Sequence, residues 1–73
     1  DGDLFVEVSS STITRSTLIV MDMTGKIVKT IQSDLLEGFN KITVNVNELA
    51  SGMYLLKVND GKALNYAQTF NKQ

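Results

Sequence analysis

The chain has 73 residues, of which 42% are hydrophobic and 21% charged, and its formal net charge is −1. This length allows one domain, residues 1–73, with a thin core, and the composition is that of a globular protein. The charge excludes the basic surplus that nucleic-acid binding or an anionic membrane surface requires. No apolar run approaches the roughly 20 residues that span a bilayer.

The sequence contains neither cysteine nor histidine. Disulfides, thiolate zinc sites and the Ser-His-Asp and Cys-His arrangements are therefore excluded. The acidic residues follow neither the EF-hand spacing nor a pattern that groups two carboxylates across a cleft. We expect no catalytic site, no cofactor and no metal site.

The first half of the chain shows alternating and short apolar runs, broken by glycine, serine and aspartate. Residues 4–8 alternate and predict a first strand. The polar stretch 9–16 is interpreted as a turn, a short strand around Ile13 and a second turn. Residues 17–23 are apolar on both faces, which predicts a central strand.

The middle of the chain begins with the turn signal Asp-Met-Thr-Gly at 22–25, which predicts a hairpin whose second strand covers 26–31. Residues 32–40 are interpreted as a connection broken by glycine. Residues 42–46 alternate cleanly and predict a strand with one wet face. Residues 47–52 predict a single helical turn that begins at an asparagine cap, with Leu49 inserted into the core.

The last part of the chain predicts two more strands. Residues 53–58 form the first of them, with the Tyr54 ring in the core and its hydroxyl at the rim. Asn-Asp-Gly at 59–61 predicts a type I′ hairpin turn, and residues 63–70 the final strand, with Leu64, Tyr66, Gln68 and Phe70 on one face. Six to seven short, mostly antiparallel strands suggest an all-β sandwich or a small barrel.

Three motifs in order carry a family resemblance. They are Leu18–Val28, which reads as a strand, Asp-x-x-Gly-Lys and a strand; Glu37–Ile42; and Leu49–Val58. Their order and spacing resemble the C-terminal sorting domain of the type IX (Por) secretion system of Bacteroidota, over about residues 3–72. The family often opens with a Pro-Asn-Pro-like stretch, and this chain has no proline.

The resemblance implies an immunoglobulin-like sandwich that serves as a secretion address at the C-terminus of a secreted protein. It implies recognition by the outer-membrane type IX translocon, then removal by a sortase-like peptidase that can anchor the cargo on the cell surface. The chain begins with aspartate and shows no signal peptide, so we expect a piece of a longer secreted protein. Its route would lead through the periplasm of a Gram-negative cell.

The candidate recognition residues are basic or lie near the end of the chain. The family tends to end with a basic residue after an apolar strand, which singles out Lys72 and Phe70; the alternative is a frayed, charged terminus. Lys26 and Lys57 either contact the translocon or are solvated lysines that protect strand edges. Four glycines are assigned to turns that need positive φ angles: Gly25, Gly38, Gly52 and Gly61.

Two other functions stay open at this point. One is an accessory β-sandwich that binds carbohydrate or protein within a surface enzyme; we expect most of the five aromatic residues to be needed in the core instead. The other is a structural spacer or dimerisation module. For the sorting function, the natural mode is addition of a partner strand at an exposed edge, with the final strand as the candidate.

Overall fold

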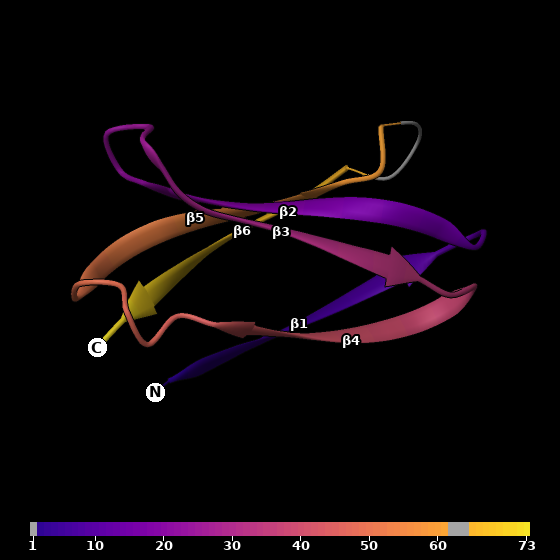
Figure 1. The fold of residues 1–73 in the computed structure, drawn as a ribbon, viewed down its shortest axis with the longest axis horizontal. Coiled ribbons are helices and arrows are strands. Elements are labelled where there is room, and N and C mark those ends of the chain that lie inside the picture. Colours follow the sequence, from indigo (N-terminus) through magenta and orange to yellow (C-terminus); the bar gives the residue numbers. More distant parts are fainter. Residues whose placement is uncertain (1, 62–64) are drawn as a thin grey trace.

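The computed structural model describes residues 2–61 and 65–73, and this part of the chain forms six β-strands (Figure 1). The strands pair antiparallel in two sheets: β1 with β4, and four strands in the order β3-β2-β5-β6. The sheets face each other, which confirms the predicted all-β, immunoglobulin-like sandwich. The strands are β1 (Asp3–Ser10), β2 (Thr14–Asp22), β3 (Ile27–Leu35), β4 (Gly38–Asn45), β5 (Gly52–Asn59) and β6 (Asn65–Lys72).

The core lies between the two sheets and is built by period-2 alternation. Most inward strand positions place a β-branched or leucine side chain against the opposite sheet, while the next residue faces outward. Leu18 and Leu56, on the two middle strands of the larger sheet, are fully buried. The buried hydrophobic residues are Val6, Val8, Leu18, Val20, Leu35, Ile42, Val44, Val46, Tyr54, Leu56 and Val58.

The central strand of the larger sheet is β2, as its two apolar faces predict. It pairs with β3 on one side and with β5 on the other, and a register irregularity lies between Val20 and Met21. Its outward residues Ile19 and Met21 are half-buried rather than exposed. A strand that is apolar on both faces is thus placed where neighbours shield it on two sides.

The prediction of a short strand around Ile13 is wrong. Ile13 is 78% exposed and lies in the connection, and Thr14 already belongs to β2. The polar start of β2 enters the sheet because its buried hydroxyl is satisfied: Ser16 is 1% exposed, and its Oγ donates to the Ser33 carbonyl at 2.9 Å. A bonded serine costs little at an inward position.

The predicted connection at 32–40 is also wrong in extent. Residues 32–35 continue β3 and residues 38–40 begin β4, so only Leu36 and Glu37 connect the strands. The stretch looks polar because β3 is an edge strand with one wet face. Its last inward residue, Leu35, is fully buried.

The link between β4 and β5 is a turn and not the predicted helical turn. The Leu49 backbone N–H donates to the Val46 carbonyl at 3.0 Å, and Asn45 rather than Asn47 supplies the side-chain acceptor, at 2.9 Å from the Asn47 nitrogen. Leu49 does pack against the core, as predicted. A single turn is thus enough to carry the chain between the two sheets.

β5 and β6 form the predicted hairpin, but the predicted tight type I′ turn is wrong, because the register pairs Asn59 with Asn65. The Gly61 N–H donates to the Asn59 side chain. Ala63 and Leu64, placed in the final strand by the sequence, lie outside the described residues. No helix of the described chain is long and apolar enough to cross a membrane.

Asn40 holds the short connection between β3 and β4. Its Oδ1 accepts from the Leu36 N–H at 2.8 Å, and its Nδ2 donates to the Leu36 carbonyl at 2.8 Å and to the Gly38 carbonyl at 3.1 Å. Gly38 has a φ of +102°, which an L side chain rarely adopts. Glycine and asparagine together thus close this two-residue connection.

We expect Asn40→Ala to lower the free energy of unfolding by about 1–3 kcal/mol, because four backbone groups lose their side-chain partner: the Leu36 N–H and the carbonyls of Leu36, Gly38 and Val8. Urea denaturation measures the change, with Asn71→Ala as the control for an exposed asparagine. Asn40→Asp keeps the acceptor and loses the two donors, so it should also destabilise. Wild-type stability in both Asn40 variants would show that the clamp is dispensable.

Asp22 orders the hairpin between β2 and β3. Its Oδ1 accepts from the Thr24 hydroxyl at 2.6 Å, the Thr24 N–H at 2.9 Å and the Lys26 N–H at 3.0 Å. The Thr24 hydroxyl, followed by the Lys26 N–H, holds the pKa of the Asp22 carboxyl below its ordinary value of 3.8. The ionised carboxylate is therefore the form that the folded turn prefers.

A depressed folded pKa contributes stability above the unfolded pKa, and this contribution disappears as the pH falls through the folded pKa. We therefore expect the stability gap between wild type and Asp22→Asn to be full at about pH 6 and to shrink as the pH falls below the ordinary value of 3.8. Urea midpoints over this range measure it, with Asp3→Asn as control. A gap that widens with acid would contradict the assignment.

Candidate recognition site

The final strand, β6, lies at the edge of the four-stranded sheet. It pairs with β5 from Asn59↔Asn65 to Gly52↔Lys72, and no strand of the described chain pairs with its other edge. Along that edge the backbone N–H and C=O groups are available to another strand. The sequence-based choice of the final strand thus falls on a true sheet edge.

The inward residues of β6 are only half-buried, whereas those of β5 beside them are buried. The facing sheet has two strands where this sheet has four, so it cannot cover the outer strands completely. Tyr66 and Phe70 pack against the margin of the core, and the Tyr66 hydroxyl donates to Gln68. The sandwich is therefore open along the β6 side.

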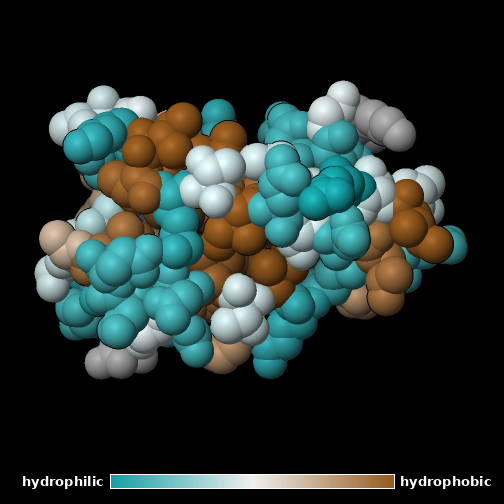
Figure 2. Space-filling model, in the orientation of Figure 1, coloured by the Kyte–Doolittle hydropathy of each residue, from teal (hydrophilic) through white to brown (hydrophobic). Residues whose placement is uncertain are grey.

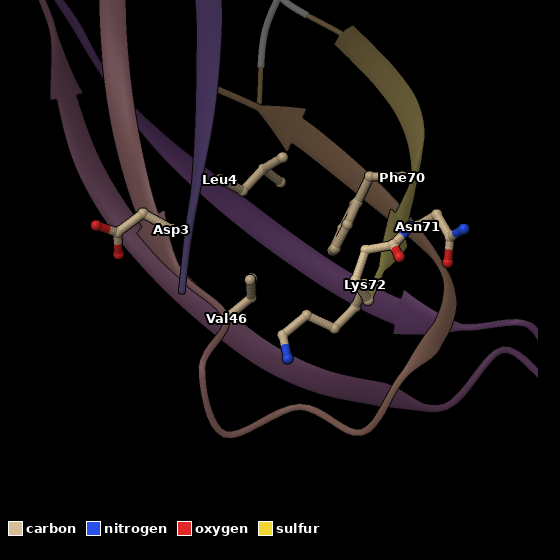
Figure 3. Close-up of a pocket in the computed structure, with 7 residues that line it drawn as sticks. Asp3, Leu4, Val46, Phe70, Asn71 and Lys72 are labelled. Carbon is tan, nitrogen blue, oxygen red and sulfur yellow. The ribbon is translucent and has the colours of Figure 1, made fainter. Parts of the chain in front are cut away.

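A small hollow of about 110 Å³ lies at the end of this open side, where β6 ends beside the start of β1 (Figure 3). Leu4, Val46 and Phe70 point toward one another across it, and the Lys72 side chain runs along its open end. Asp3 and Asn71 point away from the centre. The lining residues are Asp3, Leu4, Val46, Phe70, Asn71, Lys72 and Gln73.

Phe70 is held in place by the core. Its ring stacks on Tyr54 with centroids 5.5 Å apart and an interplanar angle of 22°. The Tyr54 ring is buried, as predicted, and its hydroxyl donates to the Ala50 carbonyl at 2.6 Å. A rigid aromatic pair therefore fixes the apolar wall of the hollow.

Of the residues singled out from sequence, the structure brings Phe70 and Lys72 together and places Lys26 and Lys57 elsewhere. Lys26 lies at the hairpin between β2 and β3, and Lys57 faces outward from β5. Lys57 does not protect an edge, because β5 has neighbours on both sides. The ion pairs of the described residues are Arg15–Asp34 at 4.0 Å and Lys29–Glu48 at 2.7 Å, and Lys72 takes part in neither.

Of the four glycines assigned to turns, Gly38 and Gly52 begin strands and Gly25 and Gly61 lie in connections, and all four have positive φ. Gly25 closes the Asp22 turn by donating its N–H to the Asp22 carbonyl at 3.0 Å. A Cβ at any of the four would meet nothing within 4 Å, so the backbone angle rather than crowding favours glycine. The angles are +90° at Gly25, +102° at Gly38, +149° at Gly52 and +79° at Gly61.

Sequence reasoning missed the other wall of the hollow. Leu4 was placed in the first strand and Val46 in a later one, with no sign that they meet the final strand. Their proximity follows from the fold, which brings the start of β1 against the end of β6. The sequence offered one signal for this site. Tyr66, Gln68 and Phe70 alternate on the inner face of the final strand, and the same alternation places Lys72 on that face.

The chemistry of this site is that of a contact surface. It offers an apolar wall, one ammonium group and an unpaired strand edge. The described residues contain no group of three or more acidic, histidine or cysteine side chains able to hold a metal ion. An exposed strand edge beside an apolar wall is suited to binding an extended polypeptide.

Comparison with known proteins gives one family. The family model of the secretion system C-terminal sorting domain matches residues 1–72, and this family is the sorting signal of type IX secretion rather than a catalytic domain. No curated protein and no solved structure matches the chain. The match covers both sheets of the sandwich and the candidate site, and it supports the sorting function over an accessory binding module. The chain therefore belongs to the type IX secretion system C-terminal sorting domain family.

Proposed function

We propose that the outer-membrane type IX translocon recognises this domain at the open β6 side, through the β6 edge, Phe70 and Lys72. The observation that carries the proposal is the position of β6: a final strand with one unpaired edge and half-buried inward side chains. Backbone groups along an edge supply affinity, and the alternating side chains supply specificity. The hollow beside Phe70 gives the partner an anchoring point.

A sorting signal implies contact with secretion machinery and a cargo chain, and a destination that is secreted or on the cell surface. We propose the Gram-negative route through the periplasm, with the cargo joined upstream in the same parent chain. A sortase-like peptidase then removes the domain and anchors the cargo on the cell surface. In this scheme the domain acts by being recognised and performs no catalysis.

The test is export of a reporter that carries a periplasmic signal peptide and this chain at its C-terminus. In a host with the type IX machinery, the reporter is expected outside the outer membrane, and in a strain that lacks the translocon it should stay in the periplasm. A known exported substrate serves as the positive control. A reporter that stays periplasmic while the positive control is exported would refute the proposal.

Charge reversal separates Lys72 from the other lysines. We expect Lys72→Glu to reduce export about tenfold, because a carboxylate at the mouth of the hollow opposes a partner selected by an ammonium group. Lys57→Glu makes the same charge change on the outer face of β5 and should leave export near wild type. Equal export by the two variants would remove Lys72 from the site.

A further inference from the structure

Three large apolar side chains protrude at one end of the sandwich. Phe39 is 89% exposed, Ile13 78% and Leu36 65%, and these are the most exposed large hydrophobic residues of the described chain. The sequence reasoning expected most aromatic residues in the core, and Phe39 is a clear exception. We call these three residues the apolar tip.

The register places Ile13 beside Leu36, and it places Phe39 at the same end of the facing sheet. Thr14 pairs with Leu35, so Ile13 and Leu36 are the next positions at the end of the β2–β3 ladder. Ser9 pairs with Phe39 at the adjoining end of the β1–β4 ladder. Both chain termini lie at the opposite end of the molecule (Figure 1), and Figure 2 shows apolar side chains gathered at the right-hand end.

The frame beneath the tip is ordered by hydrogen bonds. The Asn40 side chain bonds both the N–H and the carbonyl of Leu36 at 2.8 Å. On the other connection, the Ser10 Oγ donates to the Thr12 carbonyl at 2.7 Å. A partner that binds the tip therefore meets a preorganised surface and loses little conformational entropy on binding.

A hollow of about 360 Å³ lies beside Phe39, lined by Glu7, Phe39, Asn40 and Lys41. Exposed charges of both signs surround the tip, with acidic residues in the majority. They are Glu7, Arg15, Asp34, Glu37 and Lys41. An apolar centre within a mixed polar rim is the anatomy of a protein–protein contact.

The size, shape and surrounding charge of the apolar tip distinguish among the partners that could bind it. At about 200 Å² for a large side chain, it exposes on the order of 400 Å² of apolar surface, within the range of patches that are often functional. A symmetric dimer would set one protruding tip against another, and two protruding surfaces bury well under the roughly 800 Å² per partner of a stable interface. The acidic excess opposes an anionic membrane, and a cargo joined before residue 1 would enter at the opposite end (Figure 1).

We propose that Ile13, Leu36 and Phe39 form a second docking point, which inserts into a concave apolar pocket on a protein of the export machinery. This inference rests on the proposed function and adds to it a contact at the end of the sandwich opposite Lys72. A convex tip requires a concave partner, and the hollow beside Phe39 receives a side chain from the rim of that pocket. Recognition thus engages both ends of the domain.

The experiment uses the reporter fusion with the triple variant Ile13→Ser, Leu36→Ser, Phe39→Ser. Export is expected to fall about tenfold, while the urea midpoint of the purified chain stays near wild type. The matched control replaces three other exposed residues, Met23, Ile27 and Met53, which are 59%, 55% and 47% exposed. Failure of the wild-type fusion to be exported refutes the proposed function, whereas full export of the triple variant alone refutes the tip.

Two further measurements distinguish the occupants. A photo-crosslinking benzoylphenylalanine at position 39 is expected to form an adduct with an identified export protein in export-competent cells, and at position 53 it should not. Wild-type binding to phosphatidylethanolamine–phosphatidylglycerol vesicles that the triple variant loses would overturn the proposal in favour of a membrane contact. A wild-type dimer that the triple variant loses, seen by sedimentation velocity, would overturn it in favour of self-association.

Discussion

Replacing Leu56 with alanine is expected to lower the free energy of unfolding by about 3–4 kcal/mol. Leu56 is fully buried at the middle of β5, where it pairs with Val20 on one side and Gln68 on the other. Alanine removes the buried methyl groups and leaves a cavity that the rigid strands cannot collapse to fill. The effect is large because both sheets contact this part of the core.

The size of the effect is best judged against the stability of the whole domain. At about 0.05–0.15 kcal/mol per residue, a chain of 73 residues has a stability of about 4–11 kcal/mol. The loss expected for Leu56→Ala is therefore between about a quarter and nearly all of the stability of the domain. Urea denaturation measures the change, and Leu36→Ala makes the same substitution at a residue that is 65% exposed.

A loss below about 1 kcal/mol for Leu56→Ala would mean that the two sheets are not packed on a common core. The control variant is expected to stay within about 0.5 kcal/mol of wild type. Similar losses in both variants would point to a loosely packed chain in which position in the sandwich has little energetic meaning.

Deleting residues 70–73 is expected to abolish export of the reporter. The deletion removes the ladder pairs Tyr54↔Phe70, Met53↔Asn71 and Gly52↔Lys72, together with the stacking of Phe70 on Tyr54. It also removes one wall of the hollow and the ammonium group at its mouth. Residues 65–69 of β6 and the opposite wall of the hollow, formed by Leu4 and Val46, remain.

Folding must be separated from recognition in this experiment. The deletion is expected to lower the free energy of unfolding by about 2–3 kcal/mol, because Phe70 is half-buried. Circular dichroism at low temperature checks that the truncated chain keeps its β structure. Export at the wild-type level by the folded, truncated chain would show that the translocon reads another surface.

Alternation of side chains made most of the fold predictable. Where one face is wet, as at residues 42–46, the period of two assigned the buried positions directly, and Ile42, Val44 and Val46 are all buried. The double apolar face of β2 also predicted its central position. These signals are local, because the hydrophobic pattern of each strand depends on which of its faces are buried.

The errors arose where polar residues continue a strand. Ser16 was assigned to a turn and residues 32–35 to a connection because these stretches are polar. Pairing between β2 and β3 and the satisfied Ser16 hydroxyl keep these residues in the sheet. The two-residue connection before β4 was also not predicted. It depends on a hydrogen bond from the Asn40 side chain to the Leu36 carbonyl, and sequence alternation gives no sign of this bond. In each case, pairing with a strand distant in sequence outweighs the local conformational preference of the residues.

The candidate site was only half visible from sequence. Phe70 and Lys72 were singled out by the family resemblance, but Leu4 and Val46 enter the hollow through the arrangement of the sheets. The apolar tip was equally hidden, because Ile13 was assigned to a short strand and Phe39 to a connection, and neither assignment predicts that the two side chains are exposed at one end of the sandwich. The solvent exposure of a side chain depends on how the two sheets are assembled, so it cannot be predicted from the sequence of one strand.

The sharpest measurement is export of the reporter with Leu56→Asp, which buries a carboxylate in the core while leaving residues 65–73 unchanged. The buried carboxylate is expected to unfold the domain. If the export machinery recognises the folded surface of the sandwich, the reporter that carries this variant should remain in the periplasm. Undiminished export of an unfolded Leu56→Asp chain would show instead that a linear terminal sequence suffices.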